Sequence, residues 1–325
     1  MLNYIIRRIL STIPLLLLGL TMTFFIMRLA PGDPTTKYIN PDFDPEVRQL
    51  MLKKFGLDQP LHIQYWRWLT SFIQGDFGVS FDKSRPVVDV IKDAIFNTLI
   101  LSSLALMVSL LTGVVLGVLS AVRQYSRFDN VMTLVSLFFY SMPGFWLGLM
   151  LILLFSMVLG WLPAGEMRSI NYEYMNFAAR FADRVVHLIL PVFVLGIASA
   201  ASTMRYMRGS MLEIIRQDFI RTARAKGLNE RVVTLKHAAR NALSPVVTLF
   251  GLSIPFLFSG AVIIEIVFAW PGMGRVMLTS IFARDYPVVI AITAIAFIMV
   301  MLGNLIADIL YAVVDPRVRI DGSSK

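Results

Sequence analysis

The sequence contains no cysteine and only three histidines among its 325 residues. Without cysteine, disulfides, iron–sulfur clusters and thiol catalysis are excluded. The histidines, at positions 62, 187 and 237, lie too far apart in the sequence for a metal-ligand motif. No Gly-x4-Gly-Lys-Ser/Thr phosphate loop occurs, so the chain is not expected to bind or hydrolyse ATP by itself. Charged residues are scarce too, at 16% of the chain.

Apolar residues dominate, at 57% of the chain with a mean hydropathy of +0.70, which predicts an all-α polytopic membrane protein. Six apolar segments reach the roughly 20 residues that a spanning helix needs. They cover residues 9–27, 97–121, 130–159, 185–204, 245–268 and 287–314. Pro143-Gly144 predicts a kinked or tilted helix in the third segment. The first segment lacks a small-x-small cleavage site, so we interpret it as an uncleaved span.

This pattern predicts three regions along the chain. Residues 1–96 hold the first span and a long extracytoplasmic loop, residues 97–314 a five-span core, and residues 315–325 a cytoplasmic tail. Basic residues gather on one predicted side, which places both termini in the cytoplasm by the positive-inside rule. Besides the loop 205–243, they are Arg7, Arg8, Arg123, Arg127, Arg317 and Arg319. Topology therefore explains the net charge of +9, and no nucleic-acid partner is expected.

The loop 205–243 combines nine Lys/Arg with three acidic residues. Asp218 is suited to N-cap a helix over residues 219–226, which Gly227 closes in the left-handed conformation. Asn229 is suited to cap a second helix that runs until just before Pro245. A short helix held between spans on the cytoplasmic side is suited to dock a cytosolic partner.

Glu265 is the outstanding ionisable residue inside the predicted spans. A carboxylate at that depth is costly unless it faces water, a cavity or a polar partner. Two hypotheses stay open for it: a pathway or gating role, and a hydrogen bond that anchors the following turn over residues 270–274. In the long external loop, residues 45–56 have helical spacing. The aromatic stretch over residues 65–68 is typical of an interfacial belt or of a surface for an external partner.

Several motifs occur in a fixed order along nearly the whole chain. They are Arg-Leu-Ala-Pro-Gly-Asp-Pro at 28–34, Gly-Asp-Phe-Gly-Val-Ser at 75–80, Asp-Phe-Ile-Arg-Thr-Ala-Arg-Ala-Lys-Gly-Leu at 218–228, His-Ala-Ala-Arg-Asn-Ala-Leu-Ser-Pro at 237–245 and Glu-Ile-Val-Phe-Ala-Trp-Pro-Gly-Met-Gly at 265–274. With these motifs the chain resembles the first transmembrane subunit of dipeptide and oligopeptide ABC importers. Arg-Thr-Ala at 221–223 replaces the Glu-Ala-Ala of ABC importers in general, while Gly227 is retained.

The resemblance implies a type I ABC importer permease fold with six transmembrane helices, in a bacterial or archaeal inner membrane. It implies a non-catalytic subunit whose partners are a second homologous permease, two cytosolic ATPases that bind ATP and Mg, an extracytoplasmic peptide-binding protein and membrane lipid. Its implied ATPase-coupling residues are Asp218, Phe219, Arg221, Thr222, Ala223, Arg224, Ala225, Lys226, Gly227, His237, Arg240 and Asn241. The alternatives are the same machine with a nickel chelate or glutathione as cargo, and a stand-alone secondary transporter.

Overall fold

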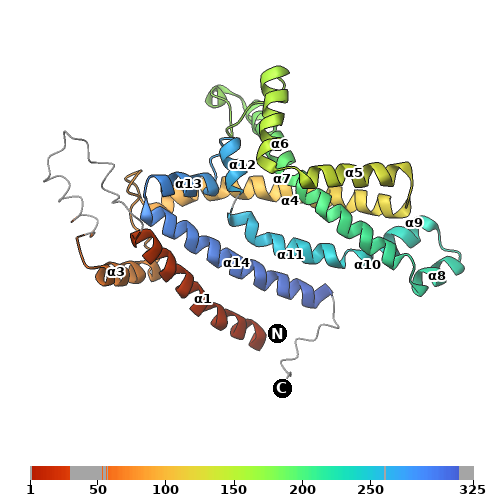
Figure 1. Cartoon of the computed structure of the whole chain (residues 1–325), viewed down its shortest axis with the longest axis horizontal. Coiled ribbons are helices and arrows are strands. Elements are labelled where there is room, and N and C mark those ends of the chain that lie inside the picture. The colour runs from red at the N-terminus through yellow and green to blue at the C-terminus, as the bar shows by residue number, and fades with distance from the viewer. Residues whose placement is uncertain (1, 30–52, 54–55, 57, 260, 315–325) are drawn as a thin grey trace.

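The structure is a computed structural model that describes residues 2–29, 53, 56, 58–259 and 261–314. The tail 315–325 and most of the helix predicted over residues 45–56 lie outside these residues. The described chain is helical and contains no strand, apart from an isolated bridge between Val79 and Pro86. Long helices run along the main axis of the molecule (Figure 1), with α3 at one end and α8 at the other.

The long helices correspond to the predicted apolar segments and extend beyond most of them. Their bounds are Leu2–Leu29 for α1, Val87–Val122 for α4, Arg127–Ser141 for α5, Phe177–Ile214 for α7, Ser244–Ser259 for α11 and Tyr286–Val314 for α14. Shorter elements lie between them: Leu61–Ile73 for α3, Gly144–Leu151 for α6, Ile152–Val158 for the π-helix η2, Tyr172–Tyr174 for the 3-10 turn η3, Val262–Val267 for α12 and Met273–Phe282 for α13. The segment between α7 and α11, which contains the predicted ATPase-coupling residues and is called the coupling segment from here on, is described below.

Three described helices are long and apolar enough to cross a membrane: α4, α7 and the part of α14 over Tyr286–Ile306. The number rises to four if the bent pair Arg127–Ser141 and Gly144–Val158 forms one span. That pair bends by 101° at Pro143, so the predicted kink is confirmed in position and is far sharper than a tilt. The first and fifth predicted spans contain shorter apolar helices. A count of six spans therefore stays a prediction.

The segment predicted as a single span over residues 245–268 is divided into α11 and α12. Ala261, just before α12, has a ψ of 74°, well outside the helical region, so the helical hydrogen-bond ladder stops there. The prediction of one continuous helix was wrong because the apolar composition continues through this break.

Helices α4 and α7 pack closely over residues 105–121 of α4 and 196–211 of α7. A Cβ on Gly113 would lie 2.6 Å from Cβ of Thr203, and one on Gly117 would lie 2.7 Å from Cβ of Met207. Only glycine allows so close an approach, as is usual where membrane helices associate. Gly113 and Gly117, one turn apart on α4, therefore form a packing face for α7.

The end of the molecule near α3 is held together by aromatic rings and one carboxylate. Tyr65 and Trp68 of α3 pack against Phe24 of α1, with ring centroids 5.4 and 5.3 Å apart, while Trp66 stays exposed. The buried Asp285, just before α14, accepts hydrogen bonds from the Ser80 hydroxyl and from the Phe81 backbone N–H. These contacts fix the loop before α4 to the start of α14.

Candidate functional site

The coupling segment lies at the end of the bundle opposite α3 (Figure 1). Its first helix, α8, covers Asp218–Ala225, one residue earlier than the predicted 219–226. Gln217, with φ −72° and ψ 150°, is the N-cap residue, so the prediction that Asp218 caps the helix was wrong. Asp218 instead occupies the first turn, where its negative charge is favourable near the positive end of the helix dipole.

Gly227 ends α8 as predicted. Its φ of +76° is left-handed, its N–H donates to the carbonyl of Arg224, and the next N–H, of Leu228, donates to Ala223. This is the hydrogen-bond pattern of a Schellman cap. A Cβ at Gly227 would meet no atom within 4 Å, so conformation, and not space, demands glycine here.

The predicted second helix is confirmed, including its cap. The Asn229 side chain accepts a hydrogen bond from the Arg231 N–H, and helical structure continues from there to Ala242. It consists of α9 (Glu230–Val232), the π-helix η4 (Val233–Ala239) and α10 (Arg240–Ala242). The wider turn of η4 was not predicted from the sequence.

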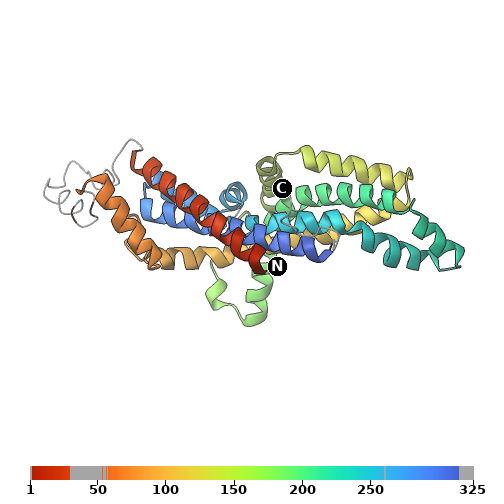
Figure 2. The ribbon, with the colours of Figure 1, turned by 90° about the horizontal axis from the view of Figure 1, so that it is seen from below.

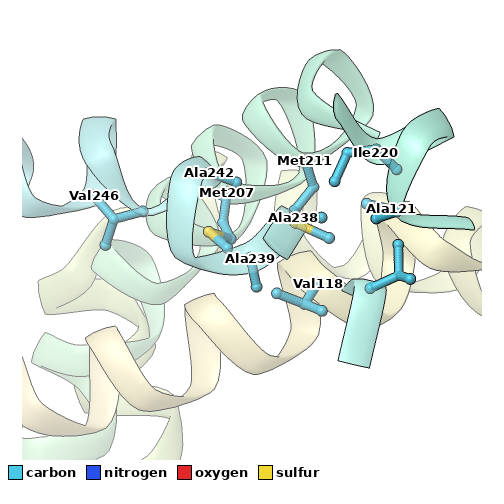
Figure 3. Close-up of a cluster of buried hydrophobic side chains, with 11 residues drawn as sticks. Val118, Ala121, Met207, Met211, Ile220, Ala238, Ala239, Ala242 and Val246 are labelled. Atoms are coloured by element: carbon cyan, nitrogen blue, oxygen red, sulfur yellow. The ribbon is translucent and has the colours of Figure 1, made fainter. Parts of the chain in front are cut away.

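Two side chains anchor α8 to the membrane helices. Ile220 is fully buried and Ala223 nearly so, and Figure 3 shows Ile220 beside Met211 of α7. The same cluster contains Val118 of α4 and Val233 of η4. Ile220 and Ala223 therefore connect α8 to α4, α7 and η4 in one buried cluster.

The other predicted coupling residues mostly face outward. His237 is half-buried and Ala223 is buried. The exposed ones are Asp218, Phe219, Arg221, Thr222, Arg224, Ala225, Lys226, Gly227, Arg240 and Asn241. Phe219 leaves 44% of its surface uncovered beside the charged residues Asp218 and Arg221. We call the exposed side of α8 with Lys226 the coupling surface.

Two of the predicted coupling residues, Arg224 and Asn241, form hydrogen bonds within the loop itself. The Arg224 guanidinium bonds the Glu230 carboxylate at 2.6 Å and so connects α8 to α9. This hydrogen bond lowers the pKa of Glu230 and raises that of Arg224. The Asn241 amide donates to the carbonyl of His237 in its own helix.

An ion pair between the partly buried Arg208 of α7 and the buried Asp129 of α5 was missed in the sequence. Arg208 donates from Nε and from a terminal nitrogen to the two oxygens of Asp129, each at 2.7 Å. The Ser126 hydroxyl caps α5 by accepting from the Asp129 N–H, and the Asp129 carboxylate accepts in turn from the Tyr125 N–H. The Ser-x-x-Asp pattern was a visible signal for the cap, but its partner lies 79 residues away and has no such signal.

Glu265 lies at the meeting point of α12, α13 and α4. Its carboxylate, fully buried, accepts from the Thr98 hydroxyl at 2.8 Å and from the Arg275 N–H at 3.0 Å. Its carbonyl accepts from the Trp270 N–H, which closes the turn that follows α12. A Cβ on Gly274 would approach the carboxylate to 2.9 Å, and one on Gly272 more closely still.

This geometry agrees with the hypothesis that Glu265 anchors the turn that follows it. The pathway or gating role stays a prediction. Thr98, which also accepts from the Met273 N–H, was not identified in the sequence because a single threonine in a long apolar helix carries no signal.

Comparisons with known proteins show the family of the chain. The family "binding-protein-dependent transport system inner membrane component" matches residues 113–320, and a family for the N-terminal part of such membrane components matches residues 1–102. The chain is 47% identical over 317 residues to the "oligopeptide transport system permease protein AppB" of Bacillus subtilis, covering 97% of this chain and 98% of that protein.

It is also 39% identical over 319 residues to the "glutathione transport system permease protein GsiC" of Escherichia coli K12, covering 98% and 99% of the two chains. Among solved structures, a chain of the MetNI methionine ABC transporter in inward-facing conformations aligns with a TM-score of 0.56 at 16% identity. That alignment covers 70% of this chain and 97% of the other, and it shows the shared fold. The chain belongs to the family of binding-protein-dependent transport system inner membrane components.

Proposed function

We propose that this chain is a permease subunit of an ATP-driven ABC importer for di- and oligopeptides, and that it forms half of the translocation pathway. The observation that carries the proposal is the construction of α8: Ile220 is buried among the membrane helices, while the coupling surface is left uncovered. The family membership supports the permease role, and the 47% identity to an oligopeptide permease supports the cargo.

The proposed partners follow from this role. Two cytosolic ATPases that hold ATP and Mg dock at the coupling surface and the equivalent surface of a second homologous permease. An extracytoplasmic binding protein delivers the peptide. The chain itself carries out no bond chemistry.

The arrangement of the ends supports a cytoplasmic position for both termini. In both views the start of α1 and the end of α14 point toward the end of the molecule that carries α8 (Figures 1 and 2). With α8 in the cytoplasm, the α3 end faces the binding protein.

Closure of the ATPases displaces α8, and the contacts of Ile220 with α7 and α4 transfer that displacement to the spans. The ATPases shift the permease between its two states only to the extent that they bind them with different affinity. A glutathione importer is a second candidate, since a permease named for glutathione transport shares 39% identity over almost the entire chain.

Affinity purification from native membranes in mild detergent tests the assembly, and reconstitution of the isolated complex tests the cargo. We expect recovery of a second permease and of Walker-motif ATPases, together with ATP-dependent uptake of tri-alanine in proteoliposomes that contain the binding protein. Recovery of the chain alone, still able to move solute, contradicts the proposal. Uptake of glutathione without uptake of tri-alanine identifies the complex as the second candidate, a glutathione importer.

A further inference from the structure

A cavity of about 490 Å³ lies between α4, α7 and α11. Its lining is unusual for the middle of long apolar helices, because hydroxyl side chains from all three helices converge on it. They are Ser102, Ser109, Ser199, Ser202, Thr203 and Ser253. The other described residues of the lining are leucine and alanine, and none of the lining residues described carries a charge.

The packing of α4 against α7 forms the rigid wall of this cavity. The helices approach closely on either side of it, at Gly196 against Ala105 and at Gly113 against Thr203. Ser109 and Thr203 are almost fully buried at this wall, whereas Ser199 is exposed at the mouth. The hydroxyls are therefore held by backbones that have little freedom to move apart.

The chemistry of the lining selects a ligand class. A hydroxyl both donates and accepts, so it serves a peptide N–H or C=O in either orientation. Thr203 donates to the Ser199 carbonyl and Ser253 to the Leu249 carbonyl, which leaves their oxygen lone pairs as acceptors. The volume falls within the roughly 300–1,000 Å³ typical of small-molecule sites. A lining without charge has no preference for the sign of a side chain.

We propose that this cavity is a contact site for short peptides in transit, one that recognises backbone amides through hydroxyls and accepts side chains of either charge. The inference rests on the proposed peptide importer and adds where, and by which groups, the peptide is held. A lipid chain or side chains of the second permease are the competing occupants.

The natural absence of cysteine allows a direct test in the assembled complex. Ser202→Cys is expected to react with a membrane-impermeant thiosulfonate reagent, and tri-alanine is expected to slow this reaction in a complex that is transporting. Ser103→Cys is the matched control, since Ser103 is exposed on α4 but does not line the cavity. Reaction at Ser103 alone, or reaction at Ser202 that peptide does not slow, contradicts the proposal.

A charge placed in the cavity supplies the second test. Relative to wild type with the same binding protein, Ser202→Asp is expected to raise the uptake ratio of Ala-Lys-Ala to Ala-Glu-Ala, and Ser202→Lys to lower it. The two ratios should differ by about tenfold or more, because nearby charges interact strongly where water is scarce. Ser202→Asn, similar in size to aspartate but neutral, should leave the ratio unchanged.

The two proposals fail in different ways. Absence of ATP-dependent tri-alanine uptake by the wild-type complex contradicts the peptide importer. Normal wild-type uptake, with the same ratio in correctly assembled Ser202→Asp and Ser202→Lys complexes, overturns the cavity proposal alone. If either charged variant does not assemble, the protection of Ser202→Cys by peptide decides whether the cavity proposal holds.

Discussion

The segment around α8 and the segment around Glu265 are both short helices held beside long ones, yet they are built in opposite ways. In α8 only Ile220 and Ala223 are buried, and most of its polar groups are left at the surface. Around Glu265 the polar groups face inward and bond one another, with Thr98 and Glu265 both fully buried. The construction of α8 leaves polar groups free to bind a partner, whereas the construction around Glu265 holds α12, α13 and α4 together.

The largest expected effect concerns the inward-facing construction. Glu265→Leu removes the acceptor for Thr98 and for the Arg275 N–H, and a buried polar group without a partner costs about 1–3 kcal/mol. We expect a loss of about 3 kcal/mol in stability, seen as a clear fall in the melting temperature in detergent. Glu265→Gln keeps an acceptor oxygen and should lose less.

Glu213→Leu, at an exposed position of α7, is the control. If Glu265→Leu has the melting temperature of wild type but abolishes uptake, the anchoring interpretation is wrong and the pathway hypothesis is favoured. If Glu265→Gln transports normally, the carboxylate charge is not needed in the pathway.

Neighbouring residues of α8 test its two faces against each other. Ile220→Ala leaves a cavity against Met211 and should cost about 2–4 kcal/mol of local packing. ATPase association is then expected to persist with weakened coupling, measured as ATP hydrolysis per peptide transported. Phe219→Ala, on the exposed side, should instead weaken ATPase association and leave the melting temperature unchanged. Identical effects of the two substitutions would remove the distinction between the faces.

Gly227→Val tests whether the cap shapes the coupling surface. A β-branched residue at a φ of +76° is strained by about 1–2 kcal/mol, so the end of α8 should fray and bind the ATPases less tightly. Membrane insertion should be normal. Gly209→Val is matched to it, because Gly209 is helical, exposed and has open space around its Cβ position. ATPase association as tight in Gly227→Val as in Gly209→Val would count against the coupling assignment.

The smallest effect concerns pH. The Arg224 guanidinium lowers the pKa of Glu230, so the pair stabilises the α8–α9 connection above the ordinary pKa of about 4.5. That contribution is lost as the pH falls through the lowered value, and it is small because the pair is exposed. NMR titration of isotope-labelled glutamate should show a lowered pKa at Glu230 that returns toward its ordinary value in Arg224→Gln. An unchanged titration in that variant would mean that the ion pair does not form.

Features that depend on residues close together in the sequence were predicted from the sequence. The glycine cap at Gly227 and the Asn229 cap each involve hydrogen bonds within a few residues, and the long apolar helices follow from composition alone. The error at Asp218 has a local cause too, since aspartate is favourable both as a cap and in the first turn. The sharpness of the bend at Pro143 depends on packing, and the sequence indicated only its position.

The sequence by itself determined the membrane class, the family resemblance and the position of the coupling segment, because apolar length, charge placement and turn residues act locally. Only the tertiary structure decided which polar groups meet. Glu265 finds Thr98 across 167 residues, Arg208 finds Asp129 across 79, and six hydroxyls from three helices surround one cavity. The physical reason is that a spanning helix is apolar on nearly every face, so its periodicity does not reveal which face a neighbour will cover.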